Sequence, residues 1–442
     1  MGNYKFFFAQ KLLKQDLTDI ACLDLVLSKK DFEEQKITQL NSCLDQCSQI
    51  EIFILGIVLQ QVSDKDLKLF IKNQPKFQNL HTLSLALGYN GIKESGVSIL
   101  GEYIKSFKEL TSLLIDLSGN KINQVGANEL FESINTVKGI QNLKVALDIN
   151  SLQNEGTLAL SKTLNSLNTQ LINLVIQLKR NQITEVGACL LGEALKNCLN
   201  LQDLVIDLSE NKIGDIGLER LATFMSYCTQ ISCLDLDLDQ SDISNNGSNA
   251  LGEALTKYKN LTFLKLCLSR NKINEMGAKG IAKGLSSCSL TSSLILEISQ
   301  NDIGDEGASA IGIGLSNCKN LLKLEIFLDS NHISDEGVTC FAEGLSKCTI
   351  LTTLLLSIYD NDITDSGYLA LDSSLLCLEN LSFFSCYLSN DDKLLKSKNL
   401  INCLKVKQLQ LVLCWCDSEI NQMEHKKKAL KIKRLVDLKI EY

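Results

Sequence analysis

A repeat period of 30 residues constrains this sequence more than any other feature. An asparagine recurs at that spacing or at a multiple of it, with one slip to 31 residues. An isoleucine or leucine follows each asparagine by two positions and a glycine follows it by six, and Gly247 keeps the period where Ser241 replaces the asparagine. The asparagines are Asn90, Asn120, Asn150, Asn181, Asn211, Asn271, Asn301, Asn331 and Asn361. The chain therefore repeats one structural unit.

Each unit predicts one strand followed by one helix. Leucine-type residues lie ten, seven, five and three positions before the asparagine, and the last three alternate at the period of two that is typical of a strand. After the glycine, as in GANELFESI at 126–134, the apolar period lengthens to three or four, which indicates an amphipathic helix of about three turns. Because a single unit cannot bury its own apolar edges, the units must stack as a solenoid.

The repeat sets the expected domain organisation. Length alone would suggest two to four domains of about 100 to 200 residues each, but stacked repeats share one core. Weaker units extend the register in both directions and predict about fourteen strands between residues 20 and 416. We expect a capping segment at 1–19, a solenoid at 20–417 with its best-formed repeats at 80–380, and a basic helical cap or tail at 418–442.

The consensus LxxLxLxLxxNxIxxxGAxxLxxxLxxC closely resembles the leucine-rich repeat. It is most similar to the long, helix-containing subfamily typified by ribonuclease inhibitor and Ran GTPase-activating protein, although its pattern begins ten residues before the asparagine instead of eight. The resemblance implies an α/β fold, a curved horseshoe of about fourteen repeats with a parallel β-sheet on the concave face and α-helices on the convex face. It also implies that the asparagines form a structural ladder whose amides bond the backbone of adjacent turns.

Acidic and aromatic residues gather at the positions that alternation directs into the concavity. Adjacent strands lie about 4.8 Å apart, so Asp207 and Asp237 are expected to be lateral neighbours, an arrangement of like charges that folding does not require. Exposed aromatic residues beside charges are typical of protein-binding surfaces. The candidates are Asp203, Asp207, Asp235, Asp237, Asp239, Glu297, Glu325, Phe327, Asp329, Tyr359 and Tyr387. The alternative is that an acidic protein simply scatters carboxylates over polar strand surfaces.

The stretch LDLDLDQSDISNNG, residues 234–247, resembles the opening of a calcium-binding loop. Gln240 replaces the glycine that such a loop needs for its turn, and Asn246 replaces the glutamate at its twelfth position. Cys414 and Cys416 form a lone C-x-C with no second pair at zinc spacing. We therefore predict no metal and no cofactor.

The cysteines indicate a reducing compartment. There are 17, an odd number, and most are scattered singly, which is not a disulfide framework. Six occupy the same place, seventeen residues after the asparagine position, where a small buried side chain would pack: Cys47, Cys198, Cys228, Cys288, Cys318 and Cys348. The prediction is a cytoplasmic protein, with the nucleus and the cilium as alternatives.

The remaining features favour a non-enzymatic scaffold. His81, His332 and His425 lie in different repeats, and no P-loop, GxSxG or HExxH motif occurs. The net charge of -8 and pI near 5.2 argue against nucleic-acid binding, and no run of about 20 apolar residues could span a membrane. We predict that the chain binds a protein with a basic surface. A Ran-type GTPase activator and a ribonuclease-inhibitor-like binder are alternatives, and membership of a larger cytoskeletal or ciliary assembly is left open.

Overall fold

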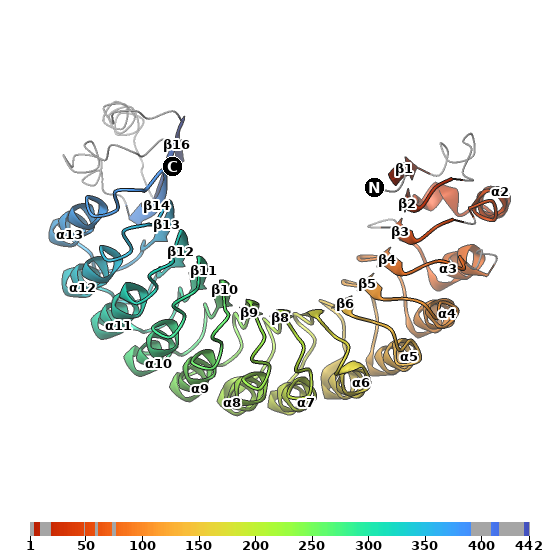
Figure 1. Cartoon of the computed structure of the whole chain (residues 1–442), viewed down its shortest axis with the longest axis horizontal. Coiled ribbons are helices and arrows are strands. Elements are labelled where there is room, and N and C mark those ends of the chain that lie inside the picture. The colour runs from red at the N-terminus through yellow and green to blue at the C-terminus, as the bar shows by residue number, and fades with distance from the viewer. Residues whose placement is uncertain are drawn as a thin grey trace. The chain divides into compact units, whose positions relative to one another are not determined.

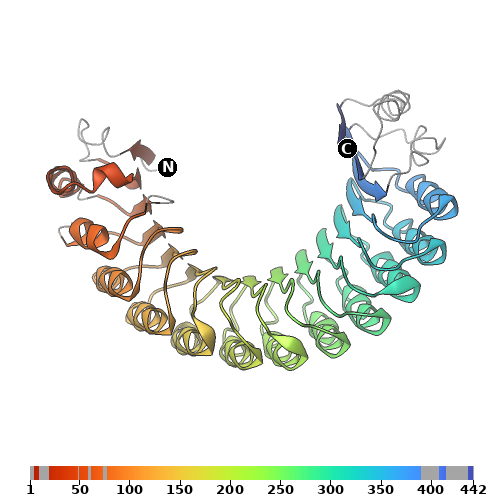
Figure 2. The same cartoon turned by 180° about the vertical axis from the view of Figure 1, so that it is seen from behind.

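The fold consists of strand–helix repeats in two compact units, Met1–Lys212 and Ile213–Tyr442. The structure is a computed structural model that describes residues 4–8, 19–47, 49–57, 61–72, 77–389, 408–414 and 437–441. Within each unit the strands form one layer and the helices form a second layer that covers only one side of the strands (Figures 1 and 2). The uncovered side of the strands is called the concave face below.

The first unit contains eight described strands, and each is parallel to the next in chain order. Its elements are β1 (Tyr4–Phe8), β2 (Cys22–Val26), the 3-10 helix η1 (Lys29–Asp31), α2 (Glu34–Leu44), β3 (Ile52–Gly56), α3 (Asp64–Ile71), β4 (Thr82–Ala86), α4 (Glu94–Lys105), β5 (Ser112–Asp116), α5 (Gln124–Ile134), β6 (Asn142–Ala146), α6 (Gln153–Leu167), β7 (Asn173–Gln177), α7 (Glu185–Leu195) and β8 (Asp203–Asp207).

The second unit has the same organisation, again with eight described parallel strands in chain order. Its elements are α8 (Gly214–Met225), β9 (Cys233–Asp237), α9 (Asn245–Leu255), β10 (Phe263–Cys267), α10 (Glu275–Leu285), β11 (Ser293–Glu297), α11 (Gly304–Ser316), β12 (Lys323–Phe327), α12 (Asp335–Leu345), β13 (Thr353–Ser357), α13 (Asp365–Leu375), β14 (Phe383–Ser389), β15 (Gln408–Cys414) and β16 (Asp437–Glu441).

The predicted alternation of parallel strands and helices is confirmed, and β2 to β15 supply fourteen strands in the expected range. The two ends contain strands that the sequence did not reveal. β1 lies in the expected N-terminal capping segment and pairs with β2. Of the expected helical cap or tail at 418–442, residues 418–436 lie outside the described residues, and Asp437–Glu441 form a strand, β16, that pairs with β15. A five-residue DLKIE segment alternates at period two, so it can extend a sheet.

The core lies between the strands and the helices of each unit. On β9, Leu234 and Leu236 are 0% and 1% exposed, whereas Asp235 and Asp237 between them are half-buried on the concave face. This alternation follows from successive strand side chains pointing to opposite faces. At about 1.5 to 3 kcal/mol for each fully buried leucine or isoleucine, these inward positions supply the main stabilising contribution.

The asparagines link each repeat to the one before it. Asn120 Nδ2 donates to Leu117 O at 2.9 Å in its own repeat and to Leu87 O at 3.0 Å in the preceding repeat. Its Oδ1 accepts a hydrogen bond from Ile92 N at 3.0 Å. Bonds to a carbonyl and from an amide of the preceding repeat recur at Asn90, Asn150, Asn181, Asn211, Asn271, Asn301, Asn331 and Asn361. The amides thus satisfy backbone groups that would otherwise be buried without partners.

Ser241 occupies the same position with a shorter side chain. It is 0% exposed, its backbone N–H donates to Asn271 Oδ1 at 3.1 Å, and its hydroxyl donates to Asp239 O at 3.2 Å within its own repeat. The hydroxyl therefore makes the same local bond, to the carbonyl two residues before it, that the amide makes in the other repeats.

A second set of side chains, which the sequence analysis did not identify, also joins neighbouring repeats. The residue four positions after the asparagine position caps the helix of the following repeat. Asp335 Oδ1 accepts hydrogen bonds from the backbone N–H of Thr364 at 2.7 Å and of Gly367 at 3.0 Å, at the start of α13. Equivalent bonds are made by Asp64, Asn154, Asp215, Asn245 and Asp305. These contacts satisfy helix N–H groups that lack a partner within the helix.

The six cysteines at the repeated position are all buried, with exposures of 0% to 3%. Burial raises the pKa of Cys288 to about 11 and that of Cys348 to about 11, so both thiols are protonated at neutral pH. Tyr258 takes this position in the repeat of Ser241 and is 2% exposed. Each of these residues therefore packs between its helix and the next strand.

Candidate partner-binding surface

Strand register fixes which side chains adjoin one another on the concave face of the second unit. One row across the strands begins at Asp237 on β9 and reaches Glu297 on β11 through Cys267 on β10. Glu297 is then paired with Phe327 on β12, and the row reaches Tyr387 on β14 through Ser357 on β13. Carboxylates therefore give way to aromatic rings along one continuous row.

The acidic end of this surface surrounds a single lysine. Lys265 Nζ lies 3.8 Å from Asp235 Oδ1. Burial lowers the pKa of Lys265, but its neighbours, first Cys267 and then Asp235, raise it by more, so the ammonium stays charged. Asp237 and Glu297 raise it further. Three carboxylates around one ammonium leave a net negative surface.

Asp239 does not belong to this open acidic surface. Its carboxylate forms a two-pronged ion pair with Arg270, in which Arg270 Nε lies 3.0 Å from Asp239 Oδ1. Arg270 is three residues after β10, and the sequence analysis did not pair it with this aspartate. The bidentate geometry satisfies the carboxylate within the protein, so Asp239 is less able to bind a partner than was expected.

Asp329, another candidate for partner binding, is buried. Its side chain is 7% exposed and accepts hydrogen bonds from Ser357 Oγ at 2.5 Å and from Tyr359 N at 2.9 Å. Burial raises the pKa of Asp329, and these hydrogen bonds oppose that shift. Asp329 therefore holds β12 and the end of β13 together, because the neighbouring strand brings both donors to its carboxylate.

The aromatic end of the surface is accessible. Phe327, Tyr359 and Tyr387 are all half-buried, with their rings on strands or strand ends of the concave side. Glu325 lies on the same strand as Phe327, and its carboxylate is 2.7 Å from Lys323 Nζ. This part of the surface is therefore mixed: the three rings are apolar, and Glu297 beside them is charged.

The first unit has an acidic surface of its own, to which the sequence analysis assigned only two members. Asp203 and Asp207 are half-buried at the two ends of β8. The structure adds Asp116 at the end of β5 and Asp148 two residues after β6. Their spacing from the asparagines could have identified both. Asp116 lies four positions before Asn120, as Asp207 does before Asn211, and Asp148 lies two positions before Asn150, as Asp239 does before Ser241.

Asp148 has a strongly altered acidity. Burial raises its pKa to about 6, and the negative charges of Asp207 and Asp116 raise it too, against a hydrogen bond from Lys179 N at 2.8 Å. Lys179 itself forms an ion pair with Glu210 at 3.0 Å. The carboxylate of Asp148 therefore changes charge within the range of pH that cells experience.

The described residues contain no group of three or more His, Cys, Asp or Glu side chains placed to hold a metal ion. Cys416 and His425, considered above as candidate ligand and catalytic residues, lie outside the described residues. Within the described helices, none combines the length and the apolar character that crossing a membrane requires.

A comparison with family models agrees with the repeat pattern. A family model described as a leucine rich repeat matches residues 204–222, 293–312 and 317–342. Among solved structures, 88 chains match. One, from the crystal structure of the Rad7 and Elc1 complex in yeast, is 14% identical, covers 88% of this chain and 89% of that chain, and has a TM-score of 0.43. Another, from the TLR13–ssRNA13 complex, is 15% identical over 99% of this chain and 62% of that chain, with a TM-score of 0.44. No curated protein sequence matches.

The strand–helix repeats and the bonds made by the asparagines define the fold. It is an α/β solenoid of the leucine-rich-repeat type, and three of its segments match the leucine rich repeat model.

Proposed function

We propose that this protein is a non-enzymatic scaffold that binds a partner protein through the concave face of the second unit. The observation that carries the proposal is the register that places Glu297 beside Phe327, at the junction of the carboxylates and the aromatic rings. Aromatic side chains supply large contact areas at protein interfaces, and neighbouring charges select the partner and speed its association. A partner with basic residues next to apolar ones fits this surface.

The surface proposed to bind consists of Asp235, Asp237, Glu297, Glu325, Phe327, Tyr359 and Tyr387. Asp239 and Asp329 are left out because their carboxylates already have partners within the protein: Arg270 pairs with Asp239, and the neighbouring strand donates a hydrogen bond to Asp329. Asp203 and Asp207, together with Asp116 and Asp148, form a separate acidic surface in the first unit that we propose contacts basic residues in the same way. The helices of 11 to 15 residues in the repeats between α4 and α13 support the resemblance to the long subfamily of leucine-rich repeats, but no described residue favours GTPase activation or ribonuclease inhibition.

Charge reversal tests the proposal. The variant Asp235→Lys/Asp237→Lys changes two half-buried, surface carboxylates and leaves the inward leucines intact. A matched control, Glu219→Lys/Glu343→Lys, makes the same change in net charge on exposed positions of α8 and α12. Proteins captured from extract by the wild type and by the control, and lost with the first variant, are the expected partners.

Affinity for a captured partner should fall at least tenfold in the concave variant, which corresponds to about 1.4 kcal/mol. Its dependence on salt should also weaken, because screening acts on the charges that have been reversed. Equal binding by all three proteins would move the binding site away from the concave face of the second unit.

A further inference from the structure

Three aromatic side chains surround one short side chain on the concave face of the second unit. Ser357 on β13 pairs laterally with Phe327 on β12 and with Tyr387 on β14. Tyr359 follows Ser357 by two residues, with the buried Ile358 between them, so Tyr359 and Ser357 share one side of the chain. Ser357 is 2% exposed, whereas the three aromatic side chains are half-buried. Phe327, Tyr359 and Tyr387 are called the aromatic triad below.

The spacing of the strands places two members of the triad within reach of one guest group. Adjacent strands lie about 4.8 Å apart, so the backbone positions of Phe327 and Tyr387 are about 9.6 Å apart, one on each side of Ser357. A group above Ser357 therefore lies about 4.8 Å to the side of both. The attraction between a cation and an aromatic ring extends to about 6 Å from the ring centre. One cation above Ser357 can thus interact with both rings.

The charged groups around the triad are mainly acidic. Strands β11 to β14 and the three residues after each of β11, β12 and β13 carry four acidic side chains and one basic side chain. They are Glu297, Glu325, Asp329, Asp360 and Lys323. Lys323 is already 2.7 Å from Glu325. The next ammonium group, Lys265 on β10, lies among the carboxylates of the acidic end described above. Even without the buried Asp329, the local charge is negative, which favours a cation and opposes a phosphate group.

Hydrogen bonds to a buried carboxyl group hold the centre of the triad in place. Asp329 Oδ1 accepts hydrogen bonds from Ser357 Oγ at 2.5 Å and from Tyr359 N at 2.9 Å. Both bonds tie the end of β13 to the end of β12, so Ser357 and the backbone of Tyr359 have fixed positions beside Phe327. Groups that are fixed before association lose less conformational entropy when a partner binds. The fold therefore preorganises the triad.

We propose that the aromatic triad binds an arginine side chain of the partner protein, with the guanidinium group above Ser357. The proposal rests on the proposed function, because it names the side chain that the concave face of the second unit would take. The rings of Phe327 and Tyr387 would contact the guanidinium group from two sides. Glu297 lies beside Phe327 on β11, and Glu325 precedes Phe327 by two residues on β12. These two carboxylates flank the site and supply acceptors for the N–H groups.

Arginine fits this site better than lysine. The guanidinium group is planar and weakly hydrated, so it stacks on aromatic rings and loses little when they displace its water. The lysine ammonium group is compact and strongly hydrated, so it gains less between half-buried rings. Guanidinium also donates in a fork to carboxylates such as those beside Phe327.

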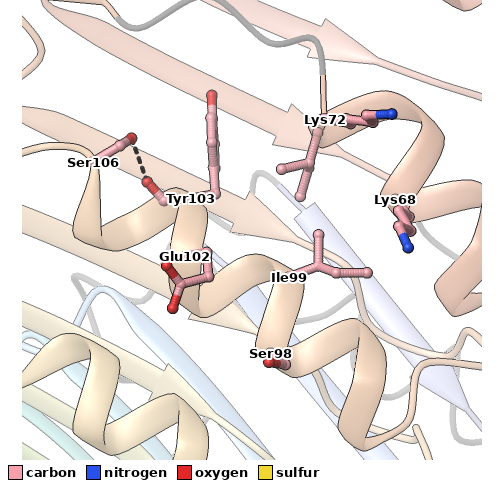
Figure 3. Close-up of a pocket in the computed structure, with 8 residues that line it drawn as sticks. Lys68, Lys72, Ser98, Ile99, Glu102, Tyr103 and Ser106 are labelled. Carbon is pink, nitrogen blue, oxygen red and sulfur yellow. Dashed lines mark hydrogen bonds between the residues drawn. The ribbon is translucent and has the colours of Figure 1, made fainter.

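An aromatic ring beside a carboxylate does not by itself make a cation site. The cavity of about 450 Å³ between α3 and α4 also contains a tyrosine and a glutamate, Tyr103 and Glu102 (Figure 3). Glu102 is paired with Lys105 at 2.7 Å, and Lys68 and Lys72 line the same cavity. The charge of that cavity is mixed, so it does not favour a guanidinium group as the surroundings of the triad do.

A displayed library of random seven-residue peptides tests the proposal with the full-length protein. Peptides are selected on the wild type and depleted on Phe327→Leu/Tyr387→Leu, which keeps apolar contact area and removes two rings. The remaining peptides are synthesised, and calorimetry measures their binding to the wild type and the variants. Tyr387→Phe keeps the ring. The matched control Tyr227→Leu/Phe263→Leu removes an exposed ring after α8 and a half-buried ring on β10. Circular dichroism checks that each variant is folded, and Tyr387→Leu replaces the double variant if that one is not.

The expected result is a set of peptides that share an arginine. Replacing that arginine by citrulline, which keeps the shape and removes the charge, should lower the affinity at least tenfold, as should Phe327→Leu/Tyr387→Leu. Tyr387→Phe and the control should leave the affinity within threefold. Selected peptides without a cation, or the absence of peptides that depend on the two rings, would overturn the proposal. So would tighter binding when lysine or trimethyllysine replaces the arginine.

Failure of this site and failure of the proposed function give different results. Asp235 and Asp237 on β9 lie three strands from Phe327, about 14 Å away. Asp235→Lys/Asp237→Lys should therefore still bind the peptides. If that variant loses the captured partners and no peptide depends on the rings, the concave face binds its partner without an arginine at the triad. If the peptides bind as expected and charge reversal leaves partner capture unchanged, the acidic end is not part of the binding site.

Discussion

The cap that one repeat supplies to the next helix can be tested at Asp335. Its Oδ1 accepts two backbone hydrogen bonds at the start of α13, and its Oδ2 accepts one from Thr364 Oγ1 at 2.5 Å. Asp335→Ala removes all three. Asp335→Asn keeps an oxygen for the backbone N–H groups, as the natural residue Asn245 does for α10.

Loss of a helix cap typically costs about 0.5 to 2 kcal/mol. Because Asp335→Ala deprives two backbone N–H groups of their acceptor, we expect a loss near the upper end, about 1.5 kcal/mol at pH 7. Asp335→Asn should lose less, about 0.5 kcal/mol, since only the charge-assisted part disappears. Asp335 also lies in the first turn of α12, and both variants remove that charge, so their difference isolates the cap of α13.

The loss should depend on pH. Burial raises the pKa of Asp335, but hydrogen bonds from Thr364 and Gly367 lower it by more, so its folded value lies below the ordinary value of 3.8. A carboxyl group with a lowered pKa contributes stability that is complete above its unfolded value and is lost as pH falls through the folded value. The difference between wild type and Asp335→Ala should therefore be constant from pH 5 to 7 and shrink below about pH 4.

Urea unfolding followed by circular dichroism measures the free-energy difference, and hydrogen exchange of the α13 amides shows whether the effect is local, as expected in a repeat protein. Asp362→Ala is the control, because Asp362 is exposed in the preceding turn and its side chain caps no described helix. A change within about 0.5 kcal/mol for Asp335→Ala, the usual range for a surface substitution, would refute the reasoning. An equal loss with Asp362→Ala would do the same.

Two further predictions concern buried polar positions. Ser241→Asn should leave the midpoint of thermal unfolding unchanged or raise it, because an asparagine at this position elsewhere adds a hydrogen bond to the preceding repeat; a clear fall would show that the position does not accept the ladder geometry. Asp148→Asn should raise stability at pH 7 and not at pH 4. A carboxyl group whose pKa is raised on folding, here to about 6 from 3.8, makes the folded protein less stable as pH rises between those values. An amide does not ionise, so it removes this loss of stability. Urea midpoints at the two pH values measure the difference, and equal effects at both would contradict the assigned acidity.

The repeat made the local structure predictable from sequence. Leu234, Leu236 and Leu238 alternate with aspartates, and a strand can bury only one of two alternating sets, so the sequence alone assigned the leucines to the core. The apolar period after Gly126 likewise predicted α5. These assignments depend on the spacing of side chains along one element, which the chain carries in its order of residues.

The ends of the chain were less predictable, because their repeats depart from the consensus. β1 and β16 are strands within segments that were expected to be a cap and a helical cap or tail. Short segments such as DLKIE have too few residues to distinguish a period of two from a period of 3.6. Pairing with the neighbouring strand decides the outcome, and that pairing is not encoded within the segment itself.

The sequence by itself thus determined the period, the strand–helix unit, the fold class and the side of each strand that faces the core. Only the tertiary structure decided which concave residues remain available: it paired Asp239 with Arg270, buried Asp329 beneath Ser357, and raised the pKa of Asp148. The physical reason is that alternation is a property of one chain segment, whereas solvation and ion pairing depend on atoms about 30 residues away in sequence that lateral register brings within hydrogen-bonding distance.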